Sequence, residues 1–393
     1  MGHPASFYAE PVSEQPQVTP GRRVHWLELL FDLVMVAYIG QVAHMLHGAP
    51  SGRDAVAFSV LLAAGWWAWV NASVTMNLFG ARVTSVLWVS VAVAMIAVGV
   101  MAASVPEALG ARAAGFAIGN AVIRVVWMLP WWMKRGATGA AWWRPFVYCL
   151  VPALLWVVSI WVPAPWRYGL WALAVAVEIV LLAVLGGATG WLQRTLDVGH
   201  LVERVSLLVV IVFGESVLSV ITQLAAHWGP PAWLAALLGF VAIVLLAWVF
   251  FTFAPGAVET GLHRLQLRGS VGGLRDTVMY LPLVLIAGVV LFAVAVGTAV
   301  ADAAAALPSS AAVCLAVGVS LFFLASGAES LRYGAGWRAV VLWAPAGVVL
   351  PWILLPVATV LSATGVVAAA VLVIAVIATL NAVNARRVRV RGG

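Results

Sequence analysis

Carboxylate side chains inside long apolar runs are the residues of this sequence with the clearest capacity for chemistry. Glu28 and Asp32 are four residues apart, so both lie on one face of a helix if the run is helical. Charged groups in such surroundings are costly and usually face the interior of a helix bundle, where they mark ion or proton pathways. The pattern therefore favours binding or movement of protons or small cations.

One arginine is set against three acids at comparable depth. Arg124 lies in an apolar run, as do Asp32, Glu178 and Glu215. An unpaired buried charge is poorly tolerated, so we expect Arg124 to bond one or two of these carboxylates. The surplus of acids predicts a protonated carboxyl or a nearby cation. The alternative is a structural ion pair that only fixes helix packing.

Two further acids lie nearer the ends of their runs. Glu28 and Glu203 are expected near a membrane surface, either at the mouth of a pathway or paired only with Arg23 and Arg204. Each glutamate follows a histidine by three residues, a spacing found in di-metal helical bundles. Those sites need two more carboxylates, so we predict no metal and no other cofactor.

The predicted pathway collects polar side chains from the first, fourth and seventh apolar runs. A substrate or ion pathway is expected to use Glu28, Asp32, Gln41, His44, Arg124, Glu203, Arg204, Glu215 and Ser216. The sequence has no nucleophile-elbow, zinc-protease or phosphate-loop motif, which lowers the expectation of an enzyme.

The composition indicates the surroundings in which these side chains must be positioned. Of 393 residues, 64% are apolar and 9% are charged, whereas soluble proteins carry about 25% charged residues. Mean hydropathy is +1.07, and the basic residues are scattered instead of forming the patch that binds nucleic acid. The chain is predicted to be an integral membrane protein whose surroundings are the lipid bilayer.

Twelve apolar runs are long enough to cross a bilayer, which takes about 20 residues in a helix. They are too long and too uniformly apolar for barrel strands, so the predicted fold is an all-α, polytopic membrane helix bundle. The predicted spans are 26–46, 55–78, 83–103, 111–133, 143–162, 166–190, 201–224, 231–254, 274–300, 309–326, 337–361 and 364–384.

Basic residues predict the orientation of these spans, because cytoplasmic loops are enriched in Lys and Arg. With the N-terminus inside, 17 basic residues fall on the cytoplasmic side, and three, Arg53, Arg112 and Arg167, fall outside. The sequence therefore predicts a multi-pass protein of the cell membrane with both termini in the cytoplasm. Residues 1–24 are expected to form a polar cytoplasmic tail, and 386–393 a basic one.

The two halves of the chain share several short patterns in the same order. His25-x-x-Glu28 and His200-x-x-Glu203 are 175 residues apart, and Gly40-Gln41 and Gly214-Glu215 are 174 apart. We interpret 25–190 and 191–385 as two six-helix repeats of parallel topology. Chance matching in a sequence rich in Trp, Ala and Val is the alternative.

Two blocks of the sequence are similar to those of a known family. Trp26-Leu-Glu-Leu-Leu-Phe-Asp-Leu-Val34, followed by Gln41-Val-Ala-His44, resembles the opening of the bacterial low-temperature-requirement A family. His200-Leu-Val-Glu-Arg204 and Gly214-Glu-Ser216 resemble a second block of that family. The resemblance covers nearly the whole chain and implies a multi-pass membrane protein without specifying an activity.

The sequence departs from the family pattern at two positions in its second half. Thr252 stands where the eighth span usually has an aspartate, and Tyr280 stands where the ninth usually has a histidine before Leu-Pro. A family function that used those two side chains would not operate here in the usual form. We therefore expect the polar site to be concentrated in spans 1, 4 and 7.

Three functional hypotheses follow. The leading one is a transporter or permease for a small solute or ion, with the proton as a candidate. A membrane enzyme acting on a lipid or hydrophobic precursor is the first alternative, and a structural or stress-adaptation protein without turnover is the second. The sequence makes no prediction of the oligomeric state.

Overall fold

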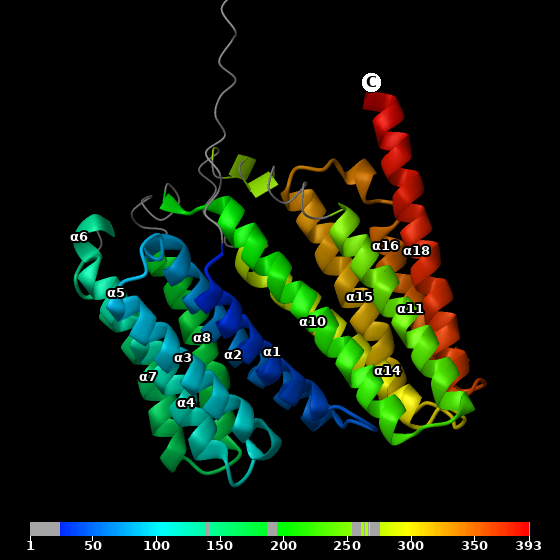
Figure 1. Ribbon diagram of the computed structural model, residues 1–393, viewed down its shortest axis with the longest axis horizontal. Helices are drawn as coiled ribbons and strands as arrows, with labels where there is room; N and C mark the ends of the chain where they lie inside the picture. Colours follow the sequence, from blue (N-terminus) through cyan, green and yellow to red (C-terminus); the bar gives the residue numbers. More distant parts are fainter. Residues whose placement is uncertain are drawn as a thin grey trace, which may run out of the picture.

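The computed structural model describes residues 24–138, 141–186, 195–253, 261–262, 264–265, 267 and 276–392. Within these ranges every extended regular element is a helix, and an isolated bridge between Ala306 and Ser362 is the single β-type pairing. Among the described residues, eleven helices are long and apolar enough to cross a membrane. The predicted all-α membrane fold is confirmed (Figure 1).

The first group of helices runs from residue 26 to residue 186. Its members are α1 (Trp26–His44), α2 (Gly52–Phe79), α3 (Ser85–Ser104), α4 (Ala113–Val126), α5 (Met128–Met133), α6 (Arg135–Thr138), α7 (Arg144–Val158) and α8 (Trp166–Gly186).

The second group begins at residue 198. Its members are α10 (Val198–Ala226), α11 (Pro230–Phe253), a π-helical turn (Asp276–Tyr280), α14 (Leu281–Ala301), α15 (Ser309–Arg332), α16 (Ala344–Val349), α17 (Leu354–Ala358) and α18 (Ala363–Gly392).

The eleventh predicted span is a broken segment instead of one long helix. It consists of α16, a 3₁₀ turn at Leu350–Ile353 and α17, which all pack along α15. Proline lacks the backbone N–H that a continuous helix needs, so closely spaced prolines interrupt it. The prolines in this segment are Pro345, Pro351 and Pro356. Span 337–361 is therefore a chain of short helices.

The first and last described residues lie at one face of the bundle, called here the terminal face (Figure 1). Helices α1 and α10 begin at this face, and α15 and α18 end there. The other side is called the opposite face. The placement of both termini in the cytoplasm stays a prediction.

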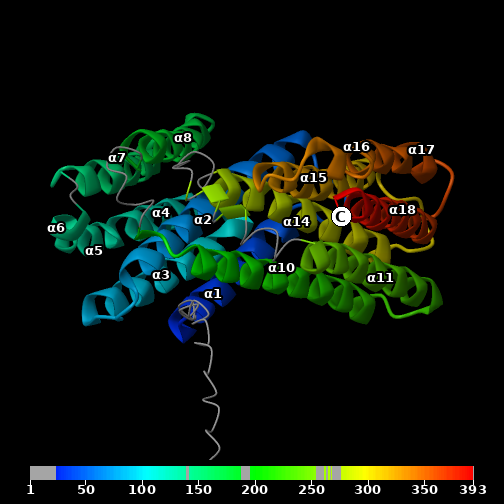
Figure 2. The same ribbon diagram turned by 90° about the horizontal axis from the view of Figure 1, so that it is seen from above.

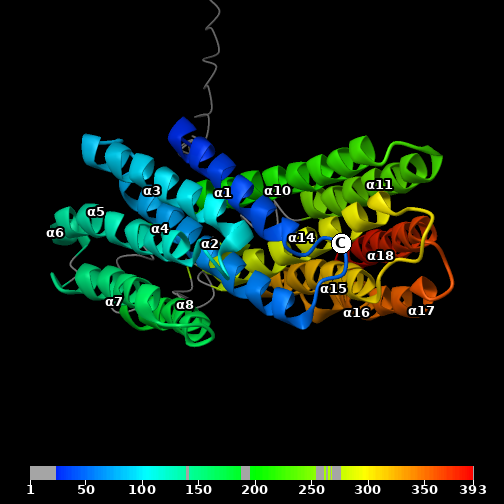
Figure 3. The same ribbon diagram turned by 90° about the horizontal axis from the view of Figure 1, so that it is seen from below.

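The two groups meet along four helices. Helices α1 and α2 each contact both α10 and α14. Figures 2 and 3 show α3–α8 on one side of this junction and α11 with α15–α18 on the other. The junction therefore joins the first and seventh predicted spans, and the internal repeat stays a prediction.

The outer surface of the bundle is apolar, as expected for a protein surrounded by lipid. Large apolar side chains are exposed on the outward sides of most spans; examples are Leu33, Val89, Ile96, Leu154, Val180, Leu237, Val244 and Leu372. This surface and the helix lengths together identify an integral membrane protein.

Candidate functional site

The start of α10 is fixed by hydrogen bonds that set the direction of its first polar side chains. Asp197 caps the helix by accepting the His200 backbone N–H at 3.0 Å. The Asn77 side chain on α2 donates to the Asp197 carbonyl at 2.8 Å and accepts the Asp197 N–H at 3.0 Å. The start of α10 is thereby held against α2.

A buried group of ionisable side chains, called here the Arg204 cluster, lies between α1, α2 and α10. It comprises Glu28, Asp32, Trp69, His200 and Arg204. Arg204 Nη1 donates to Glu28 Oε2 at 2.8 Å, and Arg204 Nη2 donates to Asp32 Oδ1 at 2.5 Å. The indole Nε1 of Trp69 donates to the same Asp32 oxygen at 2.8 Å. The cluster thus joins the first and seventh predicted spans.

His200 is oriented by its neighbours on both sides. The Asn77 amide nitrogen lies 3.0 Å from His200 Nδ1, and His200 Nε2 lies 3.2 Å from Glu28 Oε2. Because an amide nitrogen only donates, Nδ1 accepts and Nε2 carries the proton that faces Glu28. The imidazole therefore links the α2 amide to the carboxylate.

The Arg204 cluster retains unused hydrogen-bonding capacity. Asp32 Oδ2 and Arg204 Nε are buried and have no hydrogen-bond partner among the described residues. Buried polar groups are usually all paired, and these exceptions mark a place where a proton or ligand can be accommodated.

The predicted acids near the surface have different positions. Glu28 is buried and pairs with Arg204, one of the two arginines expected near Glu28 and Glu203. Glu203, its counterpart in the repeated pattern, is exposed. The other expected partner, Arg23, lies outside the described residues.

A second buried ion pair, called here the Arg124 cluster, lies within the first group. Arg124 Nε and Nη2 lie 3.0 and 2.9 Å from Glu178 Oε2, which joins α4 to α8. Arg124 Nη1 donates to the backbone and side-chain oxygens of Asn120, both at 3.0 Å. Asn71 donates to the other Glu178 oxygen at 2.6 Å and accepts from Tyr148 at 2.7 Å.

Arg124 was expected to bond one or two of three acids, and it bonds one of them, Glu178. The other two acids, Asp32 and Glu215, lie elsewhere, and Asp32 pairs with Arg204. In the Arg124 cluster one cation faces one carboxylate, and both carboxylate oxygens accept hydrogen bonds.

A cavity of about 150 Å³ lies between α1, α10 and α14, toward the opposite face. This cavity is called here the Glu215 cavity. Its lining includes Ile39, Gly40, Ala43, His44, His47, Val212, Glu215, Ser216, Ser219, Thr222, Gln223 and Val294. The lining thus contains three predicted pathway residues, His44, Glu215 and Ser216, from two different helices.

Glu215 reaches this cavity beside a glycine of α1. An added Cβ at Gly40 would collide with the Glu215 carboxylate, so the absence of a side chain there makes room for the acid. Glu215 is half-buried, and no hydrogen bond or ion pair joins its side chain to the described residues. Ser216 is buried, and its hydroxyl donates to the Val212 carbonyl at 3.0 Å.

Two histidines border the cavity where α1 ends. The rings of His44 and His47 are 5.1 Å apart, and His47 Nε2 lies 3.4 Å from Ser219 Oγ. Burial, followed by the neighbouring His44, lowers the pKa of His47 from its ordinary value. Gln41 is exposed on α1 and does not line the cavity.

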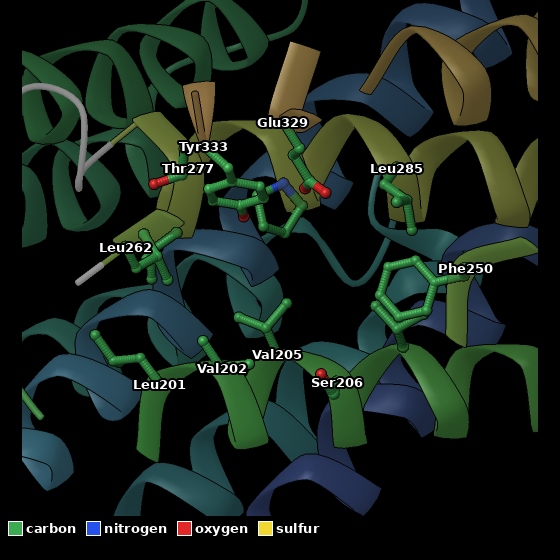
Figure 4. Close-up of a pocket in the computed structure, with 13 residues that line it drawn as sticks. Leu201, Val202, Val205, Ser206, Phe250, Leu262, Thr277, Leu285, Glu329 and Tyr333 are labelled. Atoms are coloured by element: carbon green, nitrogen blue, oxygen red, sulfur yellow. The ribbon is translucent and has the colours of Figure 1, made fainter. Parts of the chain in front are cut away.

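Sequence reasoning missed a buried acid at the other end of the second group. Glu329 on α15 is 7% exposed and lines two adjoining cavities, together with Phe250 and Tyr333. Figure 4 shows the smaller cavity, with Glu329 and Tyr333 on the side opposite Val205. The predicted span 309–326 ended three residues before Glu329, whereas α15 continues to Arg332.

The departures from the family pattern have separate surroundings. The Tyr280 ring stacks on Trp67, with 5.7 Å between ring centroids. Thr252 is exposed on α11. Among the described residues no group of three His, Cys, Asp or Glu side chains could hold a metal ion.

Comparison with known proteins identifies the family. The model of the bacterial low temperature requirement A protein family matches residues 23–379. An uncharacterized protein of Rhizobium meliloti (strain 1021) is 27% identical over 239 residues, and this chain spans 57% of that relative's length and aligns over 57% of its own. No solved structure matches the chain. Because the family match extends over nearly the whole sequence, the chain belongs to the bacterial low temperature requirement A protein family.

Proposed function

We propose that this integral membrane protein is a proton-linked transporter or permease for a small solute or ion, with its path between α1 and α10. One observation carries the proposal. The Glu215 cavity and the Arg204 cluster both lie along this pair of helices, and both contain carboxylate oxygens without a partner among the described residues. A transport path needs such groups one after another between the two faces of the protein.

The spacing of the two sites supports this path. Glu215 follows Arg204 by eleven residues on α10, which is about 16 Å at the helical rise of 1.5 Å per residue. The hydrocarbon core of a bilayer is about 30 Å thick. The two sites are therefore separated by about half the membrane, with the Arg204 cluster nearer the terminal face.

The charge of the two sites supports a link to protons. Among the described residues, Asp32 Oδ2 in the Arg204 cluster has no hydrogen-bond partner, and Glu215 has no cation beside it. Uptake of a proton at either site changes the local charge by one. A solute or ion that binds preferentially in one charge state is then coupled to that proton.

We further propose that the terminal face is cytoplasmic. The three basic residues predicted to lie outside, Arg53, Arg112 and Arg167, fall near helix ends at the opposite face. An excess of Lys and Arg on the terminal side then satisfies the positive-inside rule.

Proton movement in proteoliposomes tests the proposed function. Vesicles that enclose a pH-sensitive dye receive, one at a time, amino acids, organic cations and inorganic ions. We expect at least one of these solutes to elicit proton uptake, and Glu215→Gln or Asp32→Asn to abolish it. Glu107→Gln removes an exposed carboxylate outside the predicted pathway; it is the matched control and should retain uptake. The proposal would be contradicted if no solute elicited proton uptake by the vesicles. It would also be contradicted if both variants retained the uptake.

A structural role is proposed for the Arg124 cluster alone. Its charges balance one to one, and its carboxylate oxygens are fully paired. This saturation leaves no site for an additional proton or ligand. The membrane-enzyme alternative would instead be favoured by a deletion strain with a changed lipid profile and unchanged solute movement.

A further inference from the structure

Glu329 and Asn381 are buried polar side chains that the proposed path does not use. They are 7% and 6% exposed. No hydrogen bond or ion pair joins either side chain to the described residues. An ionisable group in such surroundings is costly unless a partner or ligand compensates it.

Both side chains line one cavity of about 160 Å³, near the terminal face of the second group. It is called here the Glu329 cavity. Its walls come from α11, α15, α18 and the segment that leads into α16, and they include Val249, Phe250, Ser326, Glu329, Ser330, Tyr333, Val340, Trp343 and Asn381. A smaller cavity of about 20 Å³ adjoins it at Phe250, Glu329 and Tyr333 (Figure 4).

The polar part of the lining is rich in acceptors. The Ser326 and Ser330 hydroxyls each donate to a backbone carbonyl at 2.8 Å, so their remaining lone pairs are available to accept. Glu329 adds a carboxylate, and Asn381 adds an amide oxygen. No Lys, Arg or His is among the described residues that line either cavity. Such a lining calls for a positively charged hydrogen-bond donor.

The aromatic part of the lining indicates which kind of cation fits. Phe250, Tyr333 and Trp343 contribute rings to the wall. Aromatic faces attract ammonium groups and also pack against alkyl chains. The volume of about 160 Å³ is several times the roughly 30 Å³ that one water occupies, so a bare alkali ion would leave most of the cavity unfilled.

We propose that the Glu329 cavity binds a small organic ammonium ion. The Glu329 carboxylate supplies the counter-charge, the Asn381 amide oxygen accepts an N–H bond, and the rings of Phe250 and Trp343 contact the alkyl part. The site shares no lining residue with the Glu215 cavity. It therefore does not depend on the proposed transport path.

Calorimetric titration of the full chain in lipid nanodiscs tests the site. The probe is butylammonium chloride, and sodium chloride at the same ionic strength is the reference. We expect saturable binding of butylammonium that is weakened about 10- to 100-fold in Glu329→Gln, because a charged hydrogen-bond partner is lost. Glu203→Gln removes an exposed carboxylate from the same group of helices and should leave the affinity unchanged.

A second variant keeps the test decisive if Glu329→Gln does not fold. Asn381→Ala retains the carboxylate and should weaken binding by a smaller factor, while thermal unfolding confirms that the bundle is intact. Absence of saturable butylammonium binding to the wild type would overturn the proposal. Equal affinity in folded Glu329→Gln, or binding of sodium at least as tight as that of butylammonium, would overturn it as well.

Discussion

Arg124 and Arg204 are both buried guanidinium groups, but their surroundings differ in how completely they are paired. Arg124 faces one carboxylate, and its Nε and both terminal nitrogens have acceptors. Arg204 faces two carboxylates, and its Nε has no partner among the described residues. We infer that the first arginine stabilises helix packing and that the second belongs to a site that changes its protonation.

The paired state of Arg124 leads to a stability prediction. Arg124→Leu leaves Glu178 as an uncompensated buried charge and should destabilise the protein by about 3–5 kcal/mol. The double variant Arg124→Leu/Glu178→Leu removes both charges and should recover most of that loss. Unfolding in detergent, followed by circular dichroism, measures both effects. A double variant no more stable than Arg124→Leu would show that this pair does more than balance charge.

His47 leads to a prediction about pH. Its pKa is lowered, chiefly by burial and then by His44, so the unfolded chain binds a proton at a higher pH than the folded protein. The stability contribution is therefore complete above the ordinary histidine pKa of about 6.5 and is lost as pH falls below it. Ser219 and Glu215 also face this region from α10.

The measurement is the unfolding temperature in detergent between pH 8 and pH 5. His47→Gln should flatten its decline below pH 6.5, whereas the same change at the exposed His227 should leave the decline as it is. Identical profiles for the wild type and His47→Gln would rule out the buried imidazole as the source.

At the residue scale, sequence reasoning found the polar positions but not all of their partners. Asp32 and Arg204 are 172 residues apart in the sequence and lie on different helices. Their contact therefore depends on how the two groups of helices meet. Glu329 was missed because the predicted span 309–326 ended three residues before it. Its burial depends on α11 and α18 packing over it.

At the element scale, close helix packing depends on small residues. Helices α14 and α15 cross where an added Cβ on Gly288 would lie 2.7 Å from the Gly318 carbonyl oxygen and 2.8 Å from the Phe322 nitrogen. Backbone atoms cannot rotate away as a side chain can. Small residues at helix crossings in membranes allow this close approach.

We predict that Gly288→Ala separates α14 from α15 and destabilises the bundle by about 1–3 kcal/mol, the usual effect of overpacking. Gly99→Ala on α3 is the control, because an added Cβ there meets no atom within 4 Å. Thermal unfolding of the two variants side by side measures the difference. Equal unfolding temperatures would contradict the packing inferred at Gly288.

The spans themselves were predictable because apolar runs of about 20 residues have few alternatives in a bilayer. Internal breaks were less predictable. The predicted span 111–133 is divided into α4 and α5 at Trp127, three residues before Pro130, which lies within α5. Hydrophobicity records that a segment crosses the membrane, whereas the prolines and local packing determine how its backbone does so.

At the scale of the whole molecule, the orientation of the bundle is open to a direct test. We predict that the C-terminus is cytoplasmic, because the basic residues are concentrated on the terminal side. A green fluorescent protein fused to the C-terminus should fluoresce, and an alkaline phosphatase fused at the same point should be inactive. Fusions at Gly110, in the loop between α3 and α4, should show the reverse pattern. The opposite result at both points would invert the proposed orientation.

The central claim is that the α1–α10 path connects the two faces instead of ending as a closed cavity. Ser216→Cys places a thiol in the Glu215 cavity with little change in size, and Ile221→Cys places one on an exposed position of the same helix. Cys149 and Cys314 are replaced by alanine in both variants, so that the introduced thiol is the only one.

The decisive measurement is the labelling of Ser216→Cys by a membrane-impermeant thiol reagent, applied separately to each face in right-side-out and inverted vesicles. The account predicts labelling from both faces, with Ile221→Cys protected by lipid. Labelling of Ser216→Cys from the opposite face alone, under every solute and pH condition, would indicate a cavity that is closed toward the terminal face. That result would contradict the proposed path.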